Sequence, residues 1–203
     1  AKGARTVLLI NQAIKAIGEL VLALTIPFLW WLIVTRRQVR FDRWLGFFLP
    51  PVQRTWLTTV IVVLFTLLLA IPLPLIVDHG ILATFVFNHR GFAGIPAALV
   101  YAIVGTSLPE EIFFRGFLLK RLQDRFGFLP ANLTQAICFG AVHGLLLAGA
   151  GNWLVTLIIV LIEMVIGYCL GWLNERRSGG SLYTSWGIHA LLNTVSALIA
   201  LFT

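Results

Sequence analysis

Long apolar runs without alternation of polar and apolar residues restrict what this chain can fold into. They cover residues 17–34, 56–77, 95–119, 131–148, 153–173 and 183–202. Each is close to the ~20 residues that a helix needs to cross a bilayer. Backbone groups in lipid must be hydrogen-bonded within the chain, and the absence of alternation favours helices over a barrel. The sequence therefore predicts an all-α, polytopic transmembrane helical bundle of about six spans.

The composition agrees with a membrane protein. The chain is 59% hydrophobic and 11% charged, with a mean hydropathy of +0.94. These values are far more apolar than those of an average soluble domain. With 203 residues, six spans and short loops fill the chain, so residues 1–203 are expected to form a single membrane domain.

The basic residues predict the orientation. The net charge is +7, but the charges flank apolar runs, as the positive-inside rule expects, so no nucleic-acid partner is predicted. Three loops that follow the first, third and fifth runs carry ten of the fifteen basic residues: Arg36, Arg37, Arg40, Arg43, Arg54, Lys120, Arg121, Arg125, Arg176 and Arg177. The opposite side carries Lys2, Arg5, Lys15 and Arg90. The three loops are therefore predicted to be cytoplasmic, and both termini external.

The segment from Arg5 to Lys15 mixes polar and apolar residues. It is interpreted either as an interfacial helix or as the end of a truncated span. No cleavable signal peptide is expected from the first apolar run.

Three polar clusters with helical spacing interrupt the apolar runs. They are Glu110-Glu111-x-x-x-Arg115, Phe139-x-x-x-His143 and His189-x-x-x-Asn193. Ionisable groups at membrane depth are costly and usually face a protein interior or a wet cavity. At ~1.5 Å per residue, each cluster lies ~9–20 Å from the basic end of its run. We expect the clusters to meet in an intramembrane polar cavity that opens toward the cytoplasmic leaflet.

The first cluster offers a base and an ion pair. Glu111 and Arg115 are four residues apart in the order that favours a helical ion pair. Successive helical residues point about 100° apart, which leaves Glu110 free to face the cavity as a general base. The competing interpretation is a helix that begins at Pro109, with Ser107 and Glu110 as a capping box.

The other two clusters offer complementary groups. Neutral His143 can take a proton from water, and Phe139 can pack as a wall of the site. His189 and Asn193 share one helical face and could stabilise an oxyanion, or could merely form a polar contact between helices. Glu163, a lone acid in the fifth run, is expected to support the site.

At these residues the chain resembles the CAAX-protease and bacteriocin-processing (CPBP, Abi) family of intramembrane glutamate proteases. The run from Pro109 to Phe117 is similar to the first motif of the family, and the two later clusters are similar to its other motifs, with Ser185-Trp186-Gly187 before the last one. The resemblance covers roughly residues 105–195. It implies that residues 95–203 form the core carrying the three motifs, and that residues 1–94 form N-terminal spans that shape access.

The resemblance also implies roles for the site residues. Glu110 and His143 are expected to activate a water, and His189 and Asn193 to stabilise the oxyanion. Glu111, Arg115 and Phe139 are expected to support the site, with no metal and no cofactor. The expected substrate is a hydrophobic or lipidated peptide at the membrane, because eukaryotic relatives remove a terminal tripeptide from prenylated proteins and many bacterial relatives are linked to peptide processing. The expected location is the bacterial plasma membrane.

Three other interpretations stay open. Two histidines and a glutamate could bind zinc, although no His-Glu-x-x-His helix is present. The clusters could hold together a non-catalytic immunity or partner-binding protein. A small ion transporter could also bury such groups, but no internal repeat is visible.

Overall fold

The computed structural model describes residues 2–35, 38–50, 55–73, 80, 82–149 and 152–203, and over these residues its regular structure is helical. The helical elements are α1 (Lys2–Trp30), η1 (Trp31–Thr35), α2 (Phe41–Leu45), α3 (Thr55–Ala70), η3 (Ala83–Phe87), η4 (Gly91–Gly94), α5 (Ile95–Leu99), η5 (Val100–Ser107), α6 (Leu108–Glu111), η6 (Ile112–Leu119), α7 (Lys120–Phe126), α8 (Phe128–Leu146), α9 (Trp153–Arg176) and α10 (Leu182–Phe202).

The predicted helical membrane bundle is confirmed. Four helical stretches are long and apolar enough to cross a membrane: Arg5–Thr35, Gly91–Phe126, Trp153–Arg176 and Leu182–Phe202. The other two predicted spans correspond to α3, whose apolar part is shorter, and to α8. Residues 74–77 of the predicted second span lie outside the described residues.

The segment from Arg5 to Lys15 is not a separate interfacial helix, because α1 runs through it without a break and the first candidate span begins at Arg5. Lys15 and Glu19 explain how a polar segment can belong to an apolar helix. They are one turn apart, with Lys15 Nζ 3.4 Å from Glu19 Oε1, so the two charges partly compensate each other.

The helix that carries the first motif does not begin at Pro109. From α5 to α7 the chain is helical throughout, and Ser107 itself has helical angles (φ −63°, ψ −43°) with no side-chain cap. Proline lacks an N–H and its ring crowds the carbonyl four residues earlier. The π-type turns of η5 and η6 on either side of α6 provide a wider turn here, a feature frequent at functional sites. The capping-box interpretation is therefore wrong.

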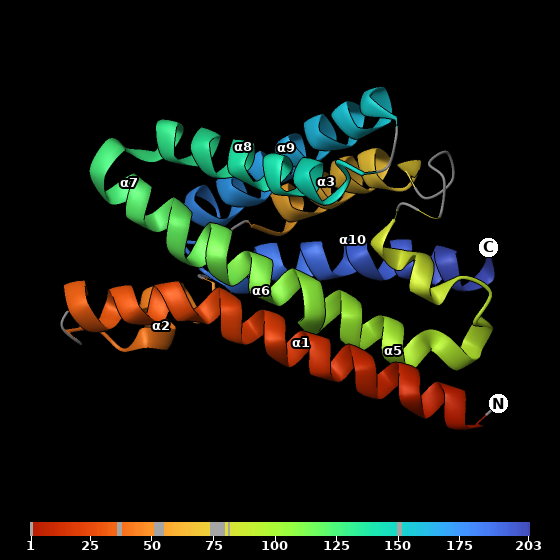
Figure 1. Ribbon diagram of the computed structural model, residues 1–203. Coiled ribbons are helices and arrows are strands. Elements are labelled where there is room, and N and C mark those ends of the chain that lie inside the picture. The colour runs from red at the N-terminus through yellow and green to blue at the C-terminus, as the bar shows by residue number, and fades with distance from the viewer. Residues whose placement is uncertain (1, 36–37, 51–54, 74–79, 81, 150–151) are drawn as a thin grey trace.

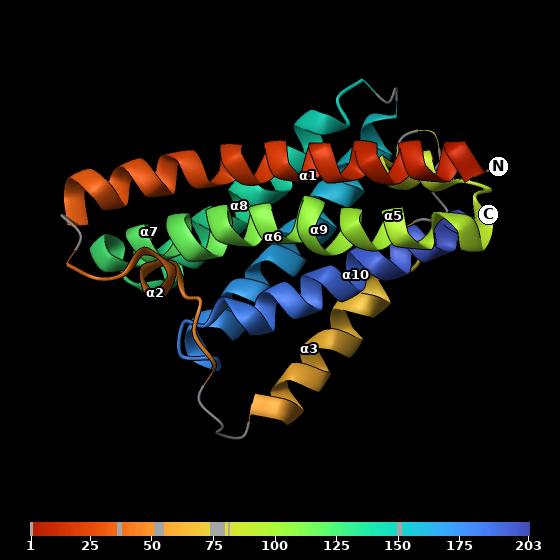
Figure 2. The same cartoon turned by 90° about the horizontal axis from the view of Figure 1, so that it is seen from below.

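The elements pack in layers (Figure 1). α1 lies along η5 and α6, which pack on α10, while α8 pairs with α9 and α3 packs against α9 and α10. The view from below shows α3 crossing the bundle at an angle (Figure 2). Both termini lie at one end of the bundle, and α2 and α7 lie at the other.

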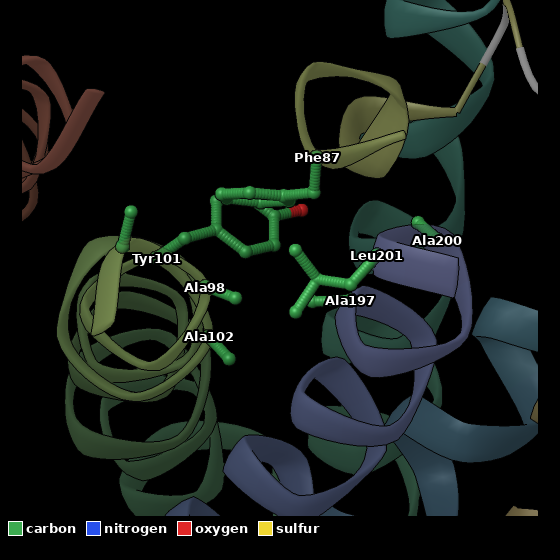
Figure 3. Packing of buried hydrophobic residues seen from close by; sticks show 8 residues of the cluster. Phe87, Ala98, Tyr101, Ala102, Ala197, Ala200 and Leu201 are labelled. Carbon is green, nitrogen blue, oxygen red and sulfur yellow. The ribbon is translucent and has the colours of Figure 1, made fainter. Parts of the chain in front are cut away.

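Alanines allow α5 and η5 to approach α10 closely. Ala98 and Ala102 face Ala197 and Leu201, and all are buried (Figure 3). Small residues bring helix backbones close enough for extensive van der Waals contact in a membrane. This packing fixes α10 against the helix that carries the glutamates, and thereby sets where His189 and Asn193 can point.

Candidate active site

The four predicted catalytic side chains line one cavity of about 580 Å³. Glu110 comes from α6, His143 from α8, and His189 and Asn193 from α10. Three separate helical stretches thus bring the clusters to a common place, as their depth in the sequence predicted.

The two neighbouring glutamates have different surroundings. The Glu111 side chain is fully buried, whereas the Glu110 side chain is 25% exposed. Glu111 Oε1 lies 3.1 Å from Arg115 Nη1, so the predicted ion pair is present. Neither Glu110 Oε2 nor Glu111 Oε2 has a hydrogen-bond partner among the described groups, but of the two residues only Glu110 lines the cavity. Glu110 is therefore the carboxylate that faces the cavity.

His189 lies between the two glutamates. Its Nδ1 is 3.0 Å from Glu111 Oε1, and its Nε2 is 3.6 Å from Glu110 Oε2. A carboxylate can only accept a hydrogen bond, so Nδ1 donates to Glu111. Glu111 consequently does more than the sequence predicted, because it joins Arg115 and also orients the imidazole of His189.

Arg115 is held from several sides inside the protein. Its side chain has no exposed surface, and its guanidinium carbon lies 4.4 Å from the centroid of the Phe139 ring. Its Nη2 donates to the carbonyl of Gly167 at 3.4 Å. A buried arginine so placed counters the charge of Glu111 and reaches α9.

Phe139 lies at the centre of the site and is itself fully buried. Its ring contacts His143 and His189, with centroid distances of 4.7 Å and 5.8 Å. His143 Nδ1 lies 2.9 Å from the Phe139 carbonyl, which can only accept, so Nδ1 carries a hydrogen. The other ring nitrogen, Nε2, is then left with its lone pair when the imidazole is neutral.

Asn193 has a partner that the sequence interpretation missed. Its Nδ2 donates to Ser107 Oγ at 2.9 Å, and Ser107 Oγ donates in turn to the carbonyl of Ala102 at 2.6 Å. An amide NH₂ has two hydrogens, so one of them stays available to another acceptor. The sequence placed Ser107 two residues before Pro109, where a cap was the obvious interpretation, and only the π-type turn gives it this role.

The cavity wall includes residues outside the three motifs. Lys15 and Glu19 of α1 contribute to it, as does Glu163 of α9, the acid that the sequence assigned to support. Within the described part of the chain, no group of three or more His, Cys, Asp or Glu side chains is arranged to hold a metal ion.

The cavity extends toward the end of the bundle that carries the termini. Its lining includes Thr84, Leu147 and Ser196, which lie on that side of the predicted catalytic groups. The described basic residues of α2, α7 and the end of α9 gather at the opposite end, where Lys120 Nζ binds Glu175 at 2.7 Å and the Gly180 carbonyl at 2.9 Å. Arg36, Arg37 and Arg54 lie outside the described residues. If the basic loops are cytoplasmic, the cavity therefore extends away from the cytoplasm. The two predictions, a cytoplasmic opening and cytoplasmic basic loops, then exclude each other.

Comparison with known proteins gives one family. A family model described as type II CAAX prenyl endopeptidase Rce1-like matches residues 92–195. This range is about half of the chain and contains all three motifs, from Glu110 to Asn193. Searches of curated proteins and of solved structures gave no match.

Proposed function

Because the chain belongs to the type II CAAX prenyl endopeptidase Rce1-like family, we propose that it is an intramembrane glutamate protease. It hydrolyses a peptide bond in a membrane-associated peptide or protein, lipidated or not, without a metal or another cofactor. The observation that carries this proposal is that Glu110, His143, His189 and Asn193 line a single cavity.

Glu110 and His143 activate the attacking water. Glu110 supplies a carboxylate oxygen that has no described hydrogen-bond partner, and His143 supplies Nε2, which is free because Nδ1 is bonded to the Phe139 carbonyl. A water between them loses a proton as its oxygen attacks the peptide carbonyl, and the proton later passes to the leaving amine. General bases placed in this way typically contribute about 10²–10⁴ in rate.

His189 and Asn193 stabilise the negative oxygen of the tetrahedral intermediate. Since Nδ1 of His189 donates to Glu111, its Nε2 donates to the oxyanion when the ring carries its second hydrogen. The free hydrogen of the Asn193 amide is the second donor, and Ser107 holds that amide in place. Glu111, Arg115 and Phe139 position these groups.

The test is hydrolysis by the purified protein in lipid vesicles. The probe is a farnesylated peptide with a free C-terminal carboxylate, and mass spectrometry identifies the products. The proposal predicts release of a short C-terminal peptide, unchanged by a strong chelator. Loss of activity on chelation, with recovery on adding zinc, would instead support the zinc interpretation. A protein that binds the peptide without cleaving it would support the non-catalytic alternative, an immunity or partner-binding protein of the same fold.

Replacement of Asn193 by alanine is expected to lower kcat by about 10²–10³-fold, the usual cost of losing one oxyanion donor. KM is expected to change little, because the interaction develops mainly in the transition state. Ser107→Ala is expected to give a smaller decrease, since it only frees the amide to rotate. Equal kcat values for Asn193→Ala and wild type would remove Asn193 from the oxyanion site.

The orientation can be measured with C-terminal fusions. The basic residues predict that the end with α2 and α7 is cytoplasmic, so alkaline phosphatase fused after Thr203 is expected to be active and green fluorescent protein to be dark. The cavity would then extend away from the cytoplasm, and the expected opening toward the cytoplasmic leaflet would be wrong. A fluorescent fusion with inactive phosphatase would reverse both conclusions.

A further inference from the structure

Glu163 is a charged residue that none of the three motifs contains. It lies in the middle of α9, which is otherwise apolar from Trp153 to Leu173, and it lines the same cavity as Glu110 and His143. A carboxylate at this depth is costly, so its retention calls for a function. Unlike Glu111, Lys15 and Glu19, it forms no ion pair with a described residue within 4.0 Å.

The close packing of α8 and α9 brings Glu163 to the level of His143. A Cβ added to Gly140 would meet Met164 and the Val160 carbonyl, the latter at 2.7 Å, and one added to Gly144 would lie 2.7 Å from Val160 Cγ2. The turn of α8 that holds His143 therefore lies directly against the turn of α9 that ends in Glu163. Both side chains point into the cavity rather than toward lipid.

The charges around His143 single out Glu163. Three carboxylates share the cavity wall with His143: Glu19, Glu110 and Glu163. Glu19 is paired with Lys15, and Glu110 lies 3.6 Å from His189, so Glu163 is the one of the three with no ion-pair partner among the described residues. Since the Nδ1 of His143 is already bonded to the Phe139 carbonyl, Glu163 acts on the ring through space and does not select its tautomer.

We propose that Glu163 is a positioning residue that stabilises the His143 imidazolium while this ring holds the proton of the attacking water. The inference rests on the proposed function. The proton leaves water for Nε2 of His143 as the new C–O bond forms, and it moves on to the leaving nitrogen as the C–N bond breaks. Glu163 takes no part in the proton transfer and forms no covalent bond.

The first experiment compares Glu163→Gln, Glu163→Asp and Glu19→Gln on the farnesylated peptide. Glu163→Gln is expected to lower kcat about ten- to hundred-fold with KM within about twofold, because a nearby opposite charge changes proton affinity by about one to two orders of magnitude. Glu163→Asp is expected to recover part of the loss. Glu19→Gln removes another carboxylate of the cavity wall, held by Lys15 on α1, and is expected to leave kcat within about twofold. A change in KM alone in Glu163→Gln would show that Glu163 binds the substrate instead, and would overturn the inference.

The second experiment does not need turnover. Diethyl pyrocarbonate modifies neutral imidazole, and mass spectrometry can follow the modification of His143 at pH 6.5. Loss of the Glu163 charge is expected to increase that rate about threefold or more, with no such increase in Glu19→Gln. Equal rates in wild type and Glu163→Gln would overturn the inference even if both proteins cleave the peptide. If the wild type cleaves nothing, the proposed function fails, while this comparison still reports whether Glu163 stabilises the protonated ring.

Discussion

Glu110→Gln is expected to reduce hydrolysis of the farnesylated peptide about 10²–10⁴-fold. Glutamine keeps nearly the same shape but lacks the negative carboxylate that helps His143 to activate the water, and Glu110 lines the cavity beside that histidine. KM is expected to stay within about threefold, because the substitution slows the chemical step and removes no contact that binds the substrate. The measurement is steady-state kinetics in lipid vesicles.

The matched control is the neighbouring glutamate. Glu111→Gln also removes a carboxylate, but one that is fully buried between Arg115 and His189, so it is expected to lower stability as well as activity. Glu110→Gln should unfold within a few degrees of wild type. Retention of more than about a tenth of the wild-type kcat by Glu110→Gln would contradict its role in activating the water.

Arg115→Met is expected to destabilise the fold by about 3–5 kcal/mol, because removal of one partner leaves the Glu111 charge buried without compensation. Methionine keeps much of the contact with the Phe139 ring, so the loss reports mainly on charge. For a chain of this size, such a loss lowers Tm by about 10 °C. Thermal unfolding in detergent, followed by circular dichroism, measures it.

Two further variants serve as controls for Arg115→Met. Arg40→Ala breaks the exposed pair with Asp42, where the arginine side chain is 81% exposed, and is expected to cost less than about 1 kcal/mol. Arg115→Lys keeps the charge but loses the planar group that stacks on Phe139 and reaches Gly167, so only partial recovery is expected. A Tm for Arg115→Met equal to that of Arg40→Ala would show that the buried pair contributes little.

The bundle and the meeting of the clusters could be predicted from the sequence for a simple reason. Bilayer thickness fixes helix length, so a position along an apolar run is also a depth. Glu110, His143 and His189 lie at compatible distances from the basic ends of their runs, and the structure places them around one cavity.

Other features depended on backbone geometry that the residue pattern does not specify. Ser107 and Pro109 are typical of a helix start. The chain nevertheless continues as a helix through them, because the wider π-type turns on either side accommodate the proline ring. Because the helix continues through Ser107, its hydroxyl lies where it accepts a hydrogen bond from the Asn193 amide. The position of α1 was also unpredictable, because Lys15 and Glu19 line the cavity only through packing of α1 on η5.

The direction of the cavity could not be derived from depth alone. Depth tells how far a group lies from an end of its helix, but it does not tell on which side the space is left open. Leu147, which borders the cavity, lies within the apolar run 131–148, and Thr84 lies between two runs; neither carries a charge that would reveal the opening.

A comparison of Glu110→Gln, His143→Ala and the double variant tests most directly whether side chains from separate helices act on one water. Groups that act as a unit show strongly non-additive losses. We expect the double variant to keep about the same residual kcat as the less active of the two single variants, within about threefold. The residual kcat is measured by mass spectrometry of the peptide released after long incubation. A double variant whose loss is the product of the two single losses would show that Glu110 and His143 act independently, and would contradict the shared site.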